Sequence, residues 1–296
     1  MKGINFIKEK RITNIFPLNK GWSRDEKYIL TDCFGERFLL RITATEKEDR
    51  AIRQYSFLRE LQNLKINCPK ALEYGKTQDA RIYTVLSFLP GEDGERALAM
   101  LSKEKGYLLG KEGGEILRKI HSLPISEETG SWWERYKPKI QRKVDTLKNC
   151  PLKIANQERI IEYYLDNTKL MQSRPMVLTH GDYHLGNMVV DNGRLGVIDF
   201  EKCNYADPYD DFKPYCWNVL ANSSFERGLI DGYFNGNIPK DFFKILKFYT
   251  AESLISHLPW AMTFGEEEIK TAFKVADSAM QWWGNFELDV PTWYKG

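Results

Sequence analysis

The dipeptide Asn192-Gly193, set between two short β-prone runs, is the feature that most restricts how this chain can fold. The runs cover residues 187–191 and 195–200. Asn and Gly both tolerate positive φ, so the arrangement predicts a β-hairpin with a two-residue turn. Asn187 then begins one strand and Asp199 ends its partner, and antiparallel pairing brings those two ends to the same side of the turn. We therefore expect the two side chains to lie within reach of one ion.

The residues just before the hairpin add another carboxylate at a spacing suited to phosphoryl transfer. His180-Gly-Asp182 precedes Asn187, and Asp199 comes seventeen positions after Asp182. In the kinase template this spacing gives a catalytic base and two metal ligands. The pattern predicts that Asp182 accepts the proton of a substrate hydroxyl and that Asn187 and Asp199 offer the hard oxygen atoms that Mg²⁺ prefers. The alternative is a hairpin whose Asp and Asn residues only form turns.

The segment resembles the catalytic core of the aminoglycoside phosphotransferase family, small-molecule kinases with a protein-kinase-like fold. That family typically reads His-Gly-Asp-x-x-x-x-Asn followed by Ile-Asp, and both patterns occur here, at residues 180–187 and 198–199. The resemblance implies an α+β, two-lobed fold with a small β-rich N-terminal lobe and a larger, mainly helical C-terminal lobe. It also implies Mg²⁺ and ATP as cofactors, with GTP as the open alternative. The acceptor would be a small-molecule hydroxyl of aminoglycoside type, which can carry positive charge.

The same core also serves other acceptors, so the resemblance leaves the substrate open. A metabolite kinase acting on choline, homoserine, a sugar or a macrolide is the alternative among enzymes. A catalytically silent nucleotide-binding module is the alternative from another class. A protein kinase fits less well, because Glu201 replaces the glycine that follows Asp-Phe in protein kinases and no Ala-Pro-Glu segment comes later.

The order of β-like and helical stretches predicts where the lobes divide. Residues 27–31, 37–42 and 81–89 are β-like, whereas most of the later sequence apart from the hairpin favours helices. This order resembles the small lobe of a kinase fold followed by a large one. The resemblance thus implies a nucleotide-binding lobe at 1–89 and a catalytic, acceptor-binding lobe at 90–296.

Two helices matter for the site. Residues 45–64 have apolar side chains in three-residue steps from Ile52, and Thr45 with Glu48 has the form of a capping box at the start. Residues 102–121 form the second predicted helix. Its interior glycines suggest close packing against a neighbour: Gly110, Gly113 and Gly114.

Four residues gain nucleotide-binding roles from the resemblance. Ser23 lies in a loop that would cover the phosphates, although an ordinary turn explains it as well. Arg41 lies where the family usually has a lysine on the α- and β-phosphates; arginine keeps the charge and adds a planar fork, and an exposed strand charge is the alternative. The backbone from Ser87 to Leu89 would bind the adenine edge, or would simply end a strand.

The groups that support these residues are less regular. The family's helix glutamate, which orients the phosphate-binding cation, has Gln54 as its nearest counterpart, with Glu48 and Glu60 less well spaced. Glu201 is expected to face solvent, with an approach to substrate or metal as the alternative. Asp207 is expected to brace the catalytic loop, with turn formation at the following proline as the alternative.

Acidic and aromatic residues mingle between positions 260 and 283. Carboxylates and ring faces suit a cationic acceptor. The rings also have the spacing of a helical core, and the acids at 266–268 suit the solvated start of a helix. We favour this second interpretation.

Composition excludes some classes of protein. The 296 residues are 42% hydrophobic and 28% charged, which is ordinary for a globular chain. A net charge of +2 gives no broad surface for nucleic acid, so we expect no nucleic-acid partner. The sequence has no secretory core and no apolar run that could span a bilayer, so we expect no membrane partner and a cytoplasmic location. The five cysteines are scattered, as for reduced thiols.

Overall fold

The contacts within the chain divide it into two compact units. The structure is a computed structural model that describes residues 3–19, 25–125 and 130–295. One unit is formed by two segments, Met1–Gly94 and Asn187–Cys203. The other is also formed by two segments, Glu95–Gly186 and Asn204–Gly296.

The hairpin belongs to the first unit, whereas the expected division into 1–89 and 90–296 assigned it to the second lobe. β6 (Glu92–Asp93) pairs with β8 (Met188–Asp191), and the rings of Phe200 and Phe57 lie 6.3 Å apart between centroids. These contacts attach residues 187–203 to the first unit. A division of the sequence at a single point cannot express this, because segments distant along the chain share one unit.

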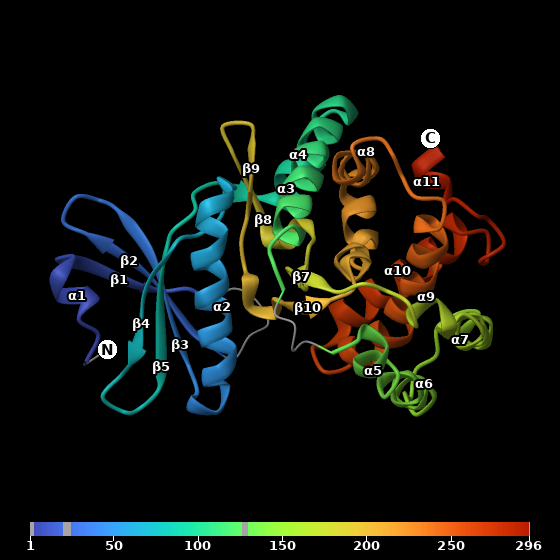
Figure 1. Ribbon diagram of the computed structural model, residues 1–296, viewed down its shortest axis with the longest axis horizontal. Coiled ribbons are helices and arrows are strands. Elements are labelled where there is room, and N and C mark those ends of the chain that lie inside the picture. Colours follow the sequence, from blue (N-terminus) through green and yellow to red (C-terminus); the bar gives the residue numbers. More distant parts are fainter. Residues whose placement is uncertain (1–2, 20–24, 126–129, 296) are drawn as a thin grey trace. The chain divides into compact units, whose positions relative to one another are not determined.

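The first unit is built on a five-stranded antiparallel sheet, shown in Figure 1. Its strands and the short helix before them are α1 (Phe6–Glu9), β1 (Ile12–Pro17), β2 (Glu26–Asp32), β3 (Arg37–Thr43), β4 (Ala71–Lys76) and β5 (Ile82–Ser87). The order across the sheet is β1-β2-β3-β5-β4, and the three expected strands are confirmed. Alternate residues of β3, Phe38, Leu40 and Ile42, are buried on one face together with Phe6 of α1.

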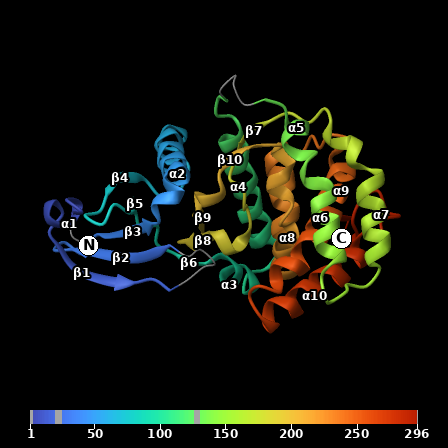
Figure 2. The ribbon, with the colours of Figure 1, turned by 90° about the horizontal axis from the view of Figure 1, so that it is seen from below.

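The helix α2 (Glu48–Leu61) lies along the sheet in Figures 1 and 2 and contacts β4 and β5. Leu58 and Leu61 are fully buried, but Ile52 is exposed. Three-residue steps drift around a helix of 3.6 residues per turn, so the expected apolar run cannot stay on one face. Short 3-10 turns flank the helix at Thr45–Lys47 and Gln62–Leu64.

The expected capping box at the start of α2 is wrong. The Thr45 hydroxyl donates to the carbonyl of Ala80 at 2.9 Å. The Glu48 carboxylate accepts hydrogen bonds from the Tyr74 hydroxyl and the Lys76 ammonium, each at 3.0 Å. Partners from β4 and from the loop between β4 and β5 have therefore taken both groups that a local cap would use.

The expected hairpin is confirmed. β8 pairs with β9 (Arg194–Val197) in antiparallel register, and β6 adds a third strand. Asn192 has φ of 49° and Gly193 has φ of 74°, so both turn residues adopt the positive φ that a tight hairpin turn requires.

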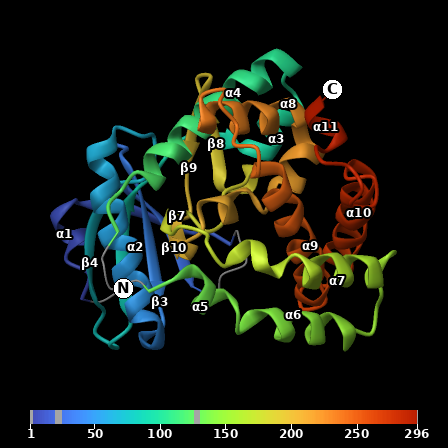
Figure 3. The same cartoon turned by 45° about the vertical axis from the view of Figure 1, so that its right-hand side comes forward.

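The second unit is mainly helical, with a two-stranded sheet of β7 (Val177–Thr179) and β10 (Asn204–Ala206). Its helices are α3 (Gly94–Ala99), α4 (Lys103–His121), α5 (Trp132–Tyr136), α6 (Lys139–Lys148), α7 (Gln157–Asp166), α8 (Tyr215–Phe234), α9 (Phe242–Ala261), α10 (Glu266–Trp282) and α11 (Thr292–Lys295). α9 contacts α6, α7 and α10, a grouping visible in Figure 3. Within the described ranges, no helix has the length and apolar character needed to cross a bilayer.

Glycines let α4 and α8 meet at backbone distance. A Cβ added at Gly110 would lie 1.9 Å from the carbonyl oxygen of Phe225, and one at Gly114 would lie 2.1 Å from that of Leu229. No side chain fits at such distances. The expected close packing is confirmed at these two positions.

A buried polar pair on α8 binds the segment that follows residue 184. The Leu185 backbone N–H donates to the Asn218 side-chain oxygen at 2.8 Å, and the Asn218 amide donates to Glu226 at 2.7 Å. Glu226 is almost completely buried, and this burial raises the pKa of its carboxyl to about 8. The pair therefore joins a neutral buried acid to the backbone of the loop.

Replacing Gly110 by alanine should lower the free energy of unfolding by about 1–3 kcal/mol, because the new methyl group meets a backbone oxygen that cannot turn aside. Denaturant unfolding followed by circular dichroism measures the loss. Gly106→Ala is the matched control, since a Cβ there first meets the side-chain amide of Asn222 at 2.7 Å. A smaller loss is expected for the control, and equal losses would contradict the explanation.

Glu226 should make stability depend on pH. Its pKa is higher in the folded chain than its ordinary value of 4.5, so its contribution is fully present at low pH and is lost as the pH rises towards about 8. We expect the Tm of the natural chain to fall across this range more steeply than that of Glu226→Gln, which stays neutral. Parallel pH profiles for the two proteins, measured by thermal unfolding, would refute this role.

Candidate functional site

The segment that carries Asp182 follows β7 and is held by the buried carboxylate of Asp211. Asp211 accepts hydrogen bonds from the backbone N–H groups of His180 at 2.7 Å and Gly181 at 2.6 Å, and lies 3.0 Å from Nε2 of His121. Gly181 has φ of 85°, which favours glycine. These contacts fix the backbone immediately before Asp182.

The other side of this loop is anchored as well. The Tyr183 hydroxyl donates to the carbonyl of Gly113 at 2.7 Å, and the bond from Leu185 to α8 holds the following turn. The Asp182 side chain is 29% exposed, and its Oδ2 lies 3.8 Å from Nε2 of His184. The loop thus presents a partly exposed carboxylate from a firmly held backbone, as a general base requires.

The expectation that Asp207 braces this loop is wrong, because Asp211 does so. Asp207 accepts a bidentate pair from Arg174 at 2.8 and 2.9 Å and a hydrogen bond from the Tyr249 hydroxyl at 2.8 Å. Both acids belong to one short acidic stretch, around the 3-10 turn Pro208–Phe212. The course of the backbone directs the first towards the helical core and the second towards the loop.

In the first unit the hairpin places Asn187 beside the residue that precedes Asp199. The Ile198 N–H donates to the Asn187 carbonyl at 2.9 Å. Asp199 has φ of 60° and ψ of 62°, a left-handed conformation that costs an ordinary residue about 1–3 kcal/mol. Strain of this kind collects at sites that bind ligands.

The carboxylate of Asp199 is suited to a cation. Its Oδ1 is buried and has no hydrogen-bond partner among the described residues, and it lies 3.5 Å from Nη1 of Arg41. Asn187 adds an amide oxygen from the start of the same hairpin. Two such donors fit Mg²⁺, which usually takes one or two carboxylates and completes its shell with water and phosphate oxygens. Groups of three or more His, Cys, Asp or Glu placed to hold a metal are absent from the part of the chain that the structure describes.

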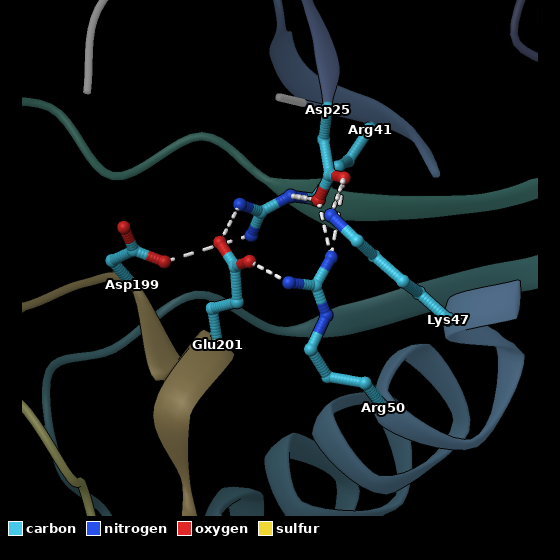
Figure 4. Close-up of polar contacts among 6 residues, drawn as sticks. All are labelled: Asp25, Arg41, Lys47, Arg50, Asp199 and Glu201. Carbon is cyan, nitrogen blue, oxygen red and sulfur yellow. Dashed lines mark hydrogen bonds and ion pairs between the residues drawn. The ribbon is translucent and has the colours of Figure 1, made fainter. Parts of the chain in front are cut away.

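Arg41, the predicted phosphate ligand on β3, is buried and bound by carboxylates (Figure 4). Its Nε donates to Asp25 at 2.8 Å, and its Nη2 donates to Glu201. Arg50 of α2 binds the same two carboxylates, Asp25 at 2.8 Å and Glu201 through Nη1. Lys47 lies 3.8 Å from Asp25. The contact of Arg41 with phosphates stays a prediction.

From α2 it is therefore Arg50, a cation, that meets the partners of Arg41, whereas Gln54, the expected counterpart of the family's glutamate, is buried. The carboxylates that meet Arg41 come instead from Asp25, just before β2, and from Glu201 in the 3-10 turn Phe200–Lys202. The Glu201 side chain is 14% exposed, so the expectation that it faces solvent is wrong. Two guanidinium groups draw it inward. The sequence feature that could have pointed to this contact is Glu201 itself, an acid where protein kinases have a glycine after Asp-Phe.

The predicted base-binding residues lie at the end of β5. The Ser87 N–H donates to the Lys70 carbonyl at 2.9 Å, and its hydroxyl accepts from the Lys70 N–H at 2.8 Å. Leu89 lies past the strand against Gly196, where an added Cβ would come within 2.6 Å of its side chain. Binding of a base by these residues stays a prediction. Because the N–H and the hydroxyl of Ser87 already bond to Lys70, the backbone after Ser87 would make most of the contacts with a base. Ser23 lies outside the described residues.

The acidic and aromatic residues near the C-terminus divide between core and surface. Trp283 is fully buried, whereas Trp260 and Phe264 are each 39% exposed. The acids at 266–268 begin α10, where negative charge complements the helix dipole. The favoured interpretation is confirmed for Trp283 and the acids, while Trp260 and Phe264 also form part of the surface.

Comparison with known proteins gives two matches at the level of sequence. A sequence model of the phosphotransferase enzyme family, APH, matches residues 14–242. An aminoglycoside 3'-phosphotransferase from Niallia circulans is 29% identical over 153 residues, which are 50% of this chain and 56% of that protein. The chain thus spans little more than half the length of this relative.

Solved structures share the fold. The GDP and kanamycin complex of APH(2")-IIia has a TM-score of 0.71 at 16% identity, over 93% of this chain and 97% of that one. Amicoumacin kinase hAmiN, in complex with AMP-PNP, Ca²⁺ and Ami, has a TM-score of 0.67 at 15% identity, over 100% of this chain and 97% of that one. These likenesses confirm the expected α+β kinase-like fold. Because the family match covers most of the 296 residues, the chain belongs to the phosphotransferase enzyme family.

Proposed function

We propose that this chain transfers the γ-phosphoryl group of a nucleoside triphosphate to a hydroxyl of a small molecule. The observation that carries the proposal is Asp199, which combines a left-handed backbone with a buried oxygen that has no hydrogen-bond partner among the described residues. A simple turn gains nothing from this arrangement, whereas a cation site does. Membership in the phosphotransferase enzyme family supports the same chemistry.

In this proposal each residue has a separate task. Asp182 accepts the proton of the acceptor hydroxyl. Asn187 and Asp199 hold Mg²⁺, which when bound neutralises charge on the phosphates. Arg41 steadies the phosphates through its N–H groups. Positioning and charge neutralisation supply the rate, because phosphoryl transfer needs little covalent chemistry from the protein.

The nucleotide would lie over the first unit. The loop with Ser23 would cover the phosphates, and the chain at Ser87 and Leu89 would bind the base. ATP is the proposed donor, with GTP as the alternative, since the related structures named above contain AMP-PNP in one case and GDP in the other. We place the reaction in the cytoplasm.

An aminoglycoside-like acceptor, and so a role in antibiotic resistance, is the substrate that the relative from Niallia circulans supports. Within the second unit, rings continue from His184 beside Asp182 to Trp217 at 6.2 Å and on to His257 at 4.8 Å between centroids. Trp260 follows at 5.8 Å and is partly exposed. Ring faces of this kind suit a cationic or ring-shaped acceptor.

Acceptor-dependent release of the nucleoside diphosphate, ADP from ATP or GDP from GTP, tests the function directly. The panel should hold aminoglycosides, macrolides, amicoumacin, choline and homoserine, each with Mg·ATP and Mg·GTP. Turnover on an aminoglycoside supports the proposed class, and turnover only on choline, homoserine or a macrolide supports the alternative kinases. Nucleotide binding without turnover on any acceptor supports the silent nucleotide-binding module and refutes the proposal.

Asp182→Asn should lower kcat roughly a hundredfold or more, because the amide cannot accept the proton of the attacking hydroxyl. Steady-state kinetics on the best acceptor measures the effect, and thermal unfolding checks that the variant is folded. Near-normal kcat in a folded variant would remove Asp182 from its role.

Asp199→Asn should separate stability from function. Asparagine tolerates the left-handed conformation better than most residues, so the Tm should stay equal or rise. Loss of the charge should weaken Mg²⁺-dependent nucleotide binding by about tenfold or more. Calorimetric titration of nucleotide with and without Mg²⁺ measures this, and unchanged Mg²⁺ dependence would exclude Asp199 as a metal ligand.

A further inference from the structure

We propose that Glu201 and Arg50 are positioning residues for Arg41. Together they take the place of the family's pair of a cation and a helix glutamate, with each charge contributed by a different element than in the family pattern. The carboxylate comes from the turn after Asp199, and α2 contributes a cation. This inference rests on the proposed function, since it gives Arg41 a phosphate to bind.

The four charged side chains form a closed ring of alternating sign (Figure 4). Arg41 binds Asp25, Asp25 binds Arg50, Arg50 binds Glu201, and Glu201 binds Arg41 again. Asp25 and Glu201 are 2% and 14% exposed, so water screens little of the attraction. Arg50 thus holds both carboxylates in the places where Arg41 meets them.

The ring determines which part of the guanidinium is directed at the proposed metal site. Nε and Nη2 of Arg41 are bound by Asp25 and Glu201, and Nη1 lies 3.5 Å from Oδ1 of Asp199. A guanidinium is planar, so two fixed nitrogens fix the direction of the third. The ring therefore directs one edge of Arg41 towards the carboxylate that would hold Mg²⁺ and its phosphates.

Two other roles for Glu201 would fit its location. It could serve only to hold the first unit together, or it could itself be a metal ligand. The effect of a metal ligand on nucleotide binding would not depend on Arg41. A purely structural contact would lower the Tm of the nucleotide-free chain when it is removed. Dependence on Arg41 therefore separates a positioning residue from a metal ligand, and an unchanged Tm separates it from a structural contact.

The test is the affinity of the full-length chain for Mg·ATP and Mg·GTP, measured by calorimetry. Glu201→Gln and Arg50→Met should each weaken binding about tenfold, because each removes a charged hydrogen bond from the ring. The same changes made in an Arg41→Ala background should weaken binding by less than about twofold further. Lys47→Ala is the matched control, since Lys47 lies outside the ring at 3.8 Å from Asp25 with its side chain 40% exposed, and it should bind like the natural chain.

Thermal unfolding of every variant shows whether it is folded, and Arg50→Lys replaces Arg50→Met if the latter is not. A further tenfold loss on adding Glu201→Gln to Arg41→Ala overturns the proposal. Equal losses in Lys47→Ala and Arg50→Met also overturn it. Turnover is not needed for this test, so a chain that binds nucleotide but phosphorylates no acceptor refutes the proposed function alone. A natural chain that binds neither nucleotide refutes both.

Discussion

The buried guanidinium of Arg41 is the constraint on which the first unit depends. A charge removed from water is tolerated only when opposite charges and hydrogen bonds surround it. Asp25 and Glu201 meet that need from two separate segments, one before β2 and one after the hairpin. The ion pairs therefore fasten the end of the hairpin to the sheet, while Arg50 fastens it to α2. The contacts that satisfy the charge also set the position of Asp199.

In the second unit, hydrogen bonds to the backbone rather than ion pairs set the position of the predicted base. The glycines of α4 bring that helix into backbone contact with α8, and the Gly113 carbonyl then receives the Tyr183 hydroxyl. α8 in turn contributes Asn218, which binds the loop further along. Asp211 holds the two N–H groups that precede Asp182. A loop fixed before and after its carboxylate needs little rearrangement when a substrate arrives, which is the property that preorganised sites share.

Sequence patterns predicted the elements whose geometry is local. The Asn192-Gly193 turn was predictable because a tight hairpin depends on the φ values of two residues. The capping box at Thr45 was not, because β4 and the loop after it supply partners for Thr45 and Glu48 that a local pattern does not contain. The exposure of Ile52 was hard to predict for the same reason, because the sheet determines which face of α2 is buried.

The partners of the site residues were harder to predict, because they are distant in sequence. Arg41 and Glu201 are 160 positions apart, and no periodicity links them. Choosing between Asp207 and Asp211 required the backbone course around a single turn, since both are acids in one stretch. The spacing made Asp182, Asn187 and Asp199 candidates, and their roles stay predictions. The groups that contact Asp199 and the loop of Asp182 could be identified only from the fold.

The departures from the family pattern in this chain conserve charge rather than remove it. An arginine in place of lysine and the lack of a glutamate partner on α2 would each weaken a phosphate site if nothing compensated. Glu201 and Asp25 supply the carboxylates, and Arg50 forms an ion pair with each of them. Within the ring two carboxylates, Asp25 and Glu201, face two guanidinium groups, Arg41 and Arg50, so these charges are withdrawn from water with neither sign in excess.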